Sequence, residues 1–263
     1  MKKLVIFLFI ASFSVVFSQT QNPTVVKMDS IRFNGDAFLG YDSFGFYYTI
    51  NNNVFSKINK RETLEYKNVS LGKITKVDLQ NPLKIVLFYE NFNTVISLDN
   101  QLNETQKINF SENPIPIVGT AIGIASQNQL WIYNSMNQQL GLYDYLSATY
   151  KTISVPFTES IKNYVSDFNV FHWIDIKNSW YMCDIFGKIT SKGKVPDFET
   201  ITIINENQFM YSKNSILILH DLEKETKTQI EISEKTFKKF YYKDQILSIF
   251  TATGITNYKI TIP

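Results

Sequence analysis

The chain has 263 residues, with 26 Lys and Arg against 24 Asp and Glu, one Cys and two His. This near balance of charge excludes the strong global field by which proteins are drawn to nucleic acid or to anionic membranes. A single Cys excludes an intrachain disulfide, and an aromatic content of 15% with only 10 Gly is typical of a packed domain rather than a disordered chain.

The N-terminus has the pattern of a secretory signal. Lys2 and Lys3 precede an apolar run from Leu4 to Phe17, and the polar Gln19 follows Ser18. The run is too short to span a bilayer, so residues 1–18 are predicted to be a signal peptide that is cleaved after Ser18. No Cys follows the run, so lipid attachment is not expected. The mature chain has 24 basic and 24 acidic residues and therefore no formal net charge.

Beyond the signal, the pattern predicts β-strands almost throughout. Short runs of Ile, Val, Leu, Tyr and Phe alternate with clusters of Asn, Asp, Lys and Ser. Residues 25–33 form the first predicted strand. Then comes a recurring unit of apolar strand, polar tight turn, apolar strand and a final Asp or Asn, at residues 46–59, 85–99, 130–144, 172–184, 209–221 and, more loosely, 246–260. The third unit predicts four strands, at 119–126, 129–134, 139–144 and 149–155. Residues 157–165 predict a short helix.

The spacing of these units predicts the fold. The anchors of the units recur roughly every 40 residues, as in the blades of a β-propeller. We expect an all-β protein, a β-propeller of about six four-stranded blades, with a seven-bladed ring or another all-β sandwich arrangement as alternatives. Residues 19–263 would form one domain, with residues 24–33 as a candidate strand that closes the ring. The approximate repeat units are 34–72, 73–116, 117–159, 160–197, 198–233 and 234–263.

Two stretches resemble a known group of proteins. Residues 68–104 and residues 123–135 (GIASQNQLWIYNS) are similar to exported β-propeller-like proteins of Bacteroidota, of the flavobacterial type. The resemblance implies a Gram-negative envelope setting and assigns no site. More distantly, the architecture resembles envelope propellers that act as scaffolds in outer-membrane assembly. We therefore expect a periplasmic protein, with association to the outer membrane through a partner, or secretion, as alternatives.

The motifs that would support catalysis or cofactor binding are missing from the sequence. It contains no G-x-S-x-G, no C-x-x-C or H-E-x-x-H, and no phosphate-binding glycine loop. Ser43 in GYDSFG is interpreted as part of a turn. We assign no catalytic, cofactor-binding or metal-binding residue and no cofactor. Carboxylates that could serve glycoside hydrolysis from distant loops are Asp36, Asp42, Glu90, Asp175 and Asp184, but no pattern selects among them.

The sequence pairs Cys183-Asp184 and His220-Asp221 are suggestive of a metal site. However, they end equivalent strands in successive units, as Asp99 and Asp144 do in earlier ones. A carboxylate at a strand end accepts hydrogen bonds from turn amides, and we predict this structural role for it. Cys183 is predicted to be a buried, inert thiol.

Aromatic side chains are dense at four places, and glycan or peptide binding is one interpretation of them. The places are Tyr47-Tyr48, Trp131-Tyr133, Trp173 and Trp180-Tyr181. We instead expect most of these rings to fill the space between blades.

Two functional hypotheses follow. The first is a non-enzymatic envelope protein that acts as a protein–protein interaction or scaffold module, with an envelope protein as partner and without nucleic acid. The second is a glycan-binding or hydrolytic propeller with a site at the channel mouth. It requires acidic or aromatic side chains from at least three blades to converge there, and the question of enzymatic activity stays open.

Overall fold

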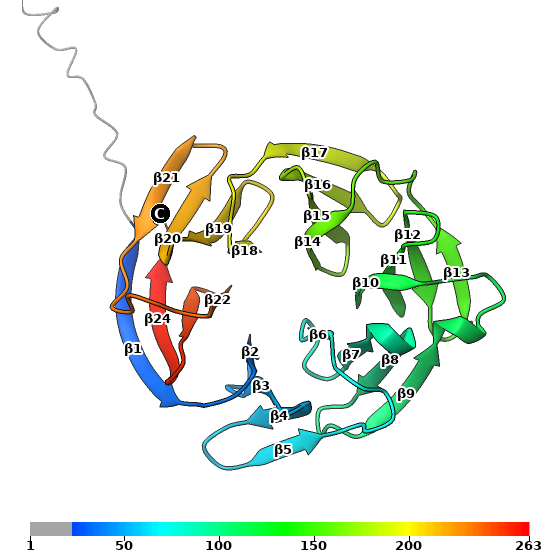
Figure 1. Ribbon diagram of the computed structural model, residues 1–263, viewed down its shortest axis with the longest axis horizontal. Helices are drawn as coiled ribbons and strands as arrows, with labels where there is room; N and C mark the ends of the chain where they lie inside the picture. Colours follow the sequence, from blue (N-terminus) through cyan, green and yellow to red (C-terminus); the bar gives the residue numbers. More distant parts are fainter. Residues whose placement is uncertain (1–22, 263) are drawn as a thin grey trace, which may run out of the picture.

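The computed structural model describes residues 23–262, so the predicted signal peptide at residues 1–18 lies outside the described part of the chain. Six four-stranded antiparallel sheets surround a central axis (Figure 1). The protein is therefore an all-β, six-bladed β-propeller. This confirms the predicted fold class and excludes the seven-bladed and sandwich alternatives.

The first three blades follow one another along the chain, and each runs from an inner to an outer strand. Blade 1 consists of β2 (Ala37–Tyr41), β3 (Tyr47–Asn51), β4 (Val54–Ile58) and β5 (Thr63–Tyr66). Blade 2 consists of β6 (Lys76–Asp78), β7 (Ile85–Tyr89), β8 (Thr94–Leu98) and β9 (Glu104–Asn109), with the short 3-10 helices η1 (Glu90–Phe92) and η2 (Phe110–Glu112). Blade 3 consists of β10 (Gly119–Ile124), β11 (Gln129–Asn134), β12 (Gln139–Asp144) and β13 (Thr149–Thr152).

The next two blades repeat this order, and the last blade departs from it. Blade 4 consists of β14 (Ile161–Ser166), β15 (Val170–Asp175), β16 (Ser179–Asp184) and β17 (Ile189–Lys194). Blade 5 consists of β18 (Thr200–Ile203), β19 (Gln208–Lys213), β20 (Ile216–Asp221) and β21 (Thr226–Ile230). Blade 6 consists of β22 (Lys239–Lys243), β23 (Ile246–Phe250), β24 (Gly254–Thr261) and, as its outer strand, β1 (Thr24–Arg32).

The ring is closed by the pairing of β1 with β24. Thr24 lies opposite Thr261, and Arg32 lies opposite Gly254, so the strands run antiparallel along their whole length. In Figure 1 the blue β1 lies against the red β24. Strands from both ends of the described chain thus share one sheet, and the outer edge of β24 is covered.

The order of strands in each blade defines two faces. Turns from first to second strand and from third to fourth strand lie on one face, which we call the hairpin face. Turns from second to third strand, together with the connections between blades, lie on the other, which we call the linker face. This assignment follows because successive strands of an antiparallel sheet run in opposite directions.

The predicted role of the strand-ending Asp residues is confirmed on the hairpin face. Asp144 Oδ1 accepts from the backbone N–H groups of Leu146 and Ser147, both at 2.9 Å. Asp99, Asp184 and Asp221 accept from their turn amides in the same way, and Asn59 takes this place in blade 1. Each side chain caps a tight turn, so the recurring acid stabilises the fold.

An Asn repeats on the linker face. Asn53, Asn93 and Asn178 occupy the second-to-third turns of blades 1, 2 and 4 with φ of 61°, 48° and 60°. Their side chains bond to the connection that follows; for example, Asn93 Oδ1 accepts from Gly119 N at 3.0 Å. Asn tolerates the left-handed conformation, so one residue both makes the turn and fixes the next linker.

Most of the predicted aromatic clusters pack between blades. Trp131 and Trp180 are wholly buried and Trp173 is 3% exposed. Trp180 contacts Phe209 of blade 5 edge to face, with ring centroids 5.8 Å apart. These contacts confirm that the rings mainly join neighbouring blades.

The helix predicted at residues 157–165 is wrong. Phe157 stacks on Trp173 with ring centroids 4.1 Å apart, and β14 begins at Ile161 and pairs with β15. The apparent helical spacing combines an inter-blade aromatic with a strand. Among the described residues no helix has the length and apolarity to cross a membrane.

Candidate functional site

A channel of about 1470 Å³ runs between the inner strands of the blades. Its lining comes from β2, β6, β14, β18 and β22 and from the loops that precede and follow them. Figure 1 shows these inner strands around the central opening. A hollow of this size, reached by side chains from five blades, is the place where a propeller most readily holds a ligand.

Positive charge dominates the channel lining. Its acidic residues are Asp36, Asp78 and Asp167, and its basic residues are Lys73, Lys76, Lys238, Lys239 and Lys243. The lining thus has a formal charge of +2, whereas the predicted mature chain is neutral. The aromatic lining residues are Phe38, Tyr164, Phe168, Phe240, Tyr241 and Tyr242.

Lys76 on β6 is held beside Tyr164 of blade 4. Its Nζ lies 4.3 Å from the centroid of the Tyr164 ring, and the Tyr164 hydroxyl accepts from Ile122 N at 3.1 Å. Burial lowers the pKa of Lys76, Asp78 opposes this effect and Lys239 adds to it. Burial also lowers the pKa of Lys239. The positive charge of Lys239 on blade 6 therefore acts on Lys76 of blade 2.

Asp78 connects the inner strands of blades 2 and 3. Its Oδ2 accepts from Ile124 N at 2.7 Å, and its Oδ1 accepts from Gln80 N at 2.8 Å. Burial raises the pKa of Asp78, while these two N–H groups and then Lys76 and Lys243 oppose the rise. Both carboxylate oxygens are used by the backbone, so the residue positions strands and leaves the lysines without an ion pair.

The carboxylates considered for hydrolysis do not converge. Asp36 reaches the channel, where its Oδ2 accepts from Asn52 N at 2.8 Å. Asp42 accepts from the Tyr48 hydroxyl at 2.7 Å, and Asp175 and Asp184 cap turns. Glu90 begins η1 in the second-to-third turn of blade 2. The arrangement offers no free acid–base pair among these five residues.

Cys183 and His220 lie in different blades. Cys183 is buried, which confirms the expected environment, and burial raises the pKa of its thiol to about 12. The His220 ring contacts Phe209 edge to face at 4.8 Å, and burial lowers its pKa. Within residues 23–262, no three His, Cys, Asp or Glu side chains form a group that could hold a metal ion.

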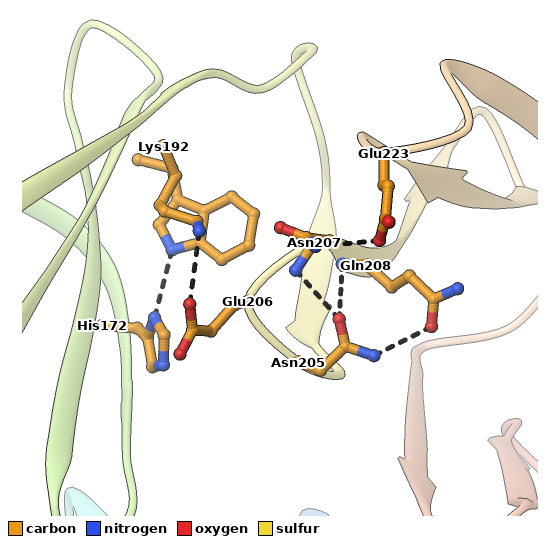
Figure 2. Close-up of polar contacts among 8 residues, drawn as sticks. His172, Lys192, Asn205, Glu206, Asn207, Gln208 and Glu223 are labelled. Carbon is orange, nitrogen blue, oxygen red and sulfur yellow. Dashed lines mark hydrogen bonds and ion pairs between the residues drawn. The ribbon is translucent and has the colours of Figure 1, made fainter.

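A second hollow, of about 400 Å³, is lined by the first and third turns of blade 5. Figure 2 shows its polar lining, where Asn205 Oδ1 accepts from the N–H groups of Asn207 and Gln208, both at 2.9 Å. Beside it, Lys192 of β17 approaches Glu206 to 3.5 Å (Figure 2). Nearby, Trp180 Nε1 donates to His172 Nδ1 at 3.4 Å. Most of these contacts maintain the turn and the blade interface.

His172 is expected to make stability fall on acidification. It is 7% exposed, and burial lowers its pKa although Asp167 and Glu206 oppose the change. The unfolded chain then binds a proton near pH 6.5 that the native state refuses, so stability declines as pH falls below about 6.5, by at most about 1.4 kcal/mol per pH unit for this group. Urea unfolding at several pH values between 5 and 7 gives the dependence of the unfolding free energy on pH. This dependence should be weaker in His172→Gln than in wild type, and an unchanged dependence would exclude His172 as its source. His220→Gln, measured in the same way, reports the part that comes from the other histidine.

Exposed apolar side chains gather on the linker face where blades 2 and 3 meet. Phe92, Ile115, Val118 and Met136, here called the rim cluster, are 49%, 50%, 43% and 63% exposed. Asn134 Oδ1 accepts from both Val118 N and Met136 N, at 3.0 and 3.2 Å, which brings two of their segments together. Asn93, next to Phe92, donates to Ile117 O at 2.6 Å. Sequence analysis missed this cluster because loop residues carry no periodic signal.

Neither a scan of protein families nor a search of curated proteins finds a match to this chain. Solved structures do match. The β-propeller domain of Cps50 from Myceliophteria thermophila has a TM-score of 0.58 at 9% identity, covering 90% of this chain and all of that one. A streptogramin B lyase has a TM-score of 0.55 at 12% identity, and the match covers 91% of this chain and 98% of the lyase. A DUF4221 family member from Bacteroides vulgatus has a TM-score of 0.53 at 9% identity, and the match covers 92% of this chain and 99% of that protein. These chains are similar to this one in fold alone, and their names indicate different roles.

Proposed function

We propose that the protein is an exported, non-enzymatic interaction module that binds an envelope protein through the rim cluster. The observation that carries this proposal is the exposure of four apolar side chains on the linker face around blades 2 and 3. Scattered exposed apolar residues are normal, whereas a group on one face marks an interaction site. The signal-like N-terminus supports export, and the carboxylates bound to turn amides support a role other than hydrolysis.

The face itself suits protein binding. Its turns are fixed by the Asn side chains described above, so the rim cluster is presented on a preorganised backbone and little ordering is needed on binding. A partner with an apolar counter-surface would remove these side chains from water. The partner is therefore expected to be a folded envelope protein rather than nucleic acid.

Substitution of the rim cluster should abolish partner capture. The variant Ile115→Lys/Met136→Lys introduces charge at positions 50% and 63% exposed, so folding should be kept while apolar contact is lost. Affinity purification from envelope extract, followed by quantitative mass spectrometry, should give a stoichiometric partner with wild type and at least tenfold less with the variant.

The matched control is Phe186→Lys. Phe186 is 86% exposed in a third-to-fourth turn of blade 4, on the opposite, hairpin face. It should retain the partner. Equal capture by the rim variant, a monomer without any partner in the extract, or self-association of the purified protein in light scattering would each contradict the proposal.

Glycan binding at the channel mouth is the second candidate. The lining aromatics of blades 1, 4 and 6 meet the requirement for rings from at least three blades. Hydrolysis is less favoured, since Asp36 and Asp78 are hydrogen-bonded to backbone N–H groups.

A further inference from the structure

The ammonium groups of the central channel lack counter-ions. In the described part of the chain, the ion pairs are Lys177–Glu159 and Lys192–Glu206, and both lie outside the channel lining. Among residues 23–262, no carboxylate lies within salt-bridge distance of Lys76, Lys239 or Lys243. Positive groups that line one cavity repel one another, and this repulsion is relieved when an anion binds between them.

The acids of the lining offset this positive charge only in part, because three carboxylates face five ammonium groups. Asp78 gives both oxygens to Ile124 N and Gln80 N, and Asp167 Oδ1 accepts from Asn169 N and Val170 N at 2.7 and 2.8 Å. Asp78 is thus held by blade 3 and by the loop that follows β6, and Asp167 is held by its own turn. The positive charge of the channel is therefore available to a ligand.

The two best-placed lysines come from different blades. Lys76 is on β6 of blade 2, where the Tyr164 ring fixes its ammonium, and Lys239 is on β22 of blade 6. Blade 1 separates them, and the charge of Lys239 adds to the lowering of the Lys76 pKa. A molecule with two separated anionic groups could bind one group at Lys76 and the other at Lys239.

The remaining lining determines the kind of molecule. The Tyr164 and Tyr241 rings line the cavity, and Tyr241 contacts Phe38 edge to face at 6.1 Å. A volume of about 1470 Å³ is much larger than an inorganic ion needs. The Lys ammonium is a compact charge without the planar, two-pronged donor geometry of Arg. It can therefore donate to carboxylate, sulfate or phosphate groups alike.

We propose that the central channel binds a small organic polyanion, with anionic groups on Lys76 and Lys239 and its carbon skeleton against Tyr164 and Tyr241. The site is separate from the rim cluster, so either assignment can fail without the other. The ligand neutralises the positive charge that Lys76 and Lys239 bring to the channel lining.

Calorimetric titration at 20 mM salt tests the site with four probes: citrate, trigalacturonate, inorganic phosphate and the uncharged maltotriose. At least one of the two organic polyanions should bind measurably, more weakly at 500 mM salt, and maltotriose should not. Lys76→Met and Lys239→Met should each weaken binding at least tenfold. The control Lys60→Met, at an exposed turn lysine of blade 1, should leave it unchanged.

Stability separates a binding role from a structural one. Because the Lys76 ammonium lies over the Tyr164 ring but makes no ion pair within the described residues, Lys76→Met should leave the melting temperature of the free protein unchanged or raise it. A structural lysine would lower it. No binding of either organic polyanion, equal binding of maltotriose, phosphate binding as tight as citrate binding, or full affinity in the Lys76→Met/Lys239→Met double variant would each overturn the proposal.

Discussion

A variant that lacks residues 24–32 is expected to lose cooperative folding altogether. Those residues form β1, the outer strand of blade 6, and they cover the edge of β24. β24 contains Ile255, Tyr258 and Ile260, which are at most 4% exposed in the native protein. Without β1 the edge of this buried strand would present unpaired N–H and C=O groups, a surface prone to aggregation. Circular dichroism should show no sharp thermal transition, and size exclusion should show aggregates.

The control keeps the strand and changes one exposed side chain. Val26→Thr alters a residue that is 55% exposed on β1, and its melting temperature should match that of wild type. A synthetic peptide of residues 24–32 should restore part of the fold, since a strand can add to an open sheet edge. A truncated protein that melts cooperatively within a few degrees of wild type would show that ring closure contributes little.

Trp131→Ala is expected to be the most destabilising of the single substitutions considered, at about 3–5 kcal/mol. Trp131 is wholly buried between blades 3 and 4, its ring lies 6.0 Å from that of Phe171, and its Nε1 donates to Asp167 O at 2.8 Å. The substitution leaves a cavity and deprives a carbonyl of its partner. Urea unfolding should show the loss as a lower midpoint at constant slope.

Two further variants separate the contribution of apolar burial at Trp131 from that of its hydrogen bond. Trp131→Phe keeps most of the apolar contact and loses the hydrogen bond, so it should fall between wild type and Trp131→Ala. Phe186→Ala removes a ring that is 86% exposed and should change stability by less than about 0.5 kcal/mol. Equal urea unfolding midpoints for Trp131→Ala and Phe186→Ala would show that the aromatic side chains between blades do not hold the blades together.

The fold could be predicted from the sequence because each blade repeats the same pattern of strands and turns. The repeat anchors Tyr47, Val86, Trp131, Trp173, Met210 and Leu247 all lie on the second strand of a blade. That strand is buried on both faces, so it is a continuous apolar run followed by a tight polar turn. Its regular recurrence distinguished the propeller from a sandwich.

The helix at residues 157–165 could not be judged correctly from local pattern. Phe157 is apolar because it stacks between Tyr133 and Trp173, at 5.0 and 4.1 Å, and not because it continues the face of a helix. Strand pairing with β15 then fixes Ile161–Ser166. Contacts with distant residues overrode the local preference.

The channel lysines were missed for a related reason. β6 reads Lys76-Val77-Asp78, which in sequence is an ordinary half-exposed strand with polar residues toward solvent. Only the ring arrangement shows that its polar side borders an enclosed channel shared with Lys239 of blade 6. The charge of each strand is visible in sequence, but the convergence of strands that are more than 150 residues apart is not.

The pairing of Thr24 with Thr261 makes the chain almost circular. Directly opposed residues of antiparallel strands lie about 5 Å apart, so a linker of a few residues could join them without distortion. New termini could then be opened in an exposed connection between two other blades, giving a circular permutant in which every blade is built from one continuous segment. Comparing its unfolding with that of the native order would measure how much cooperativity comes from a blade that draws on both ends of the chain.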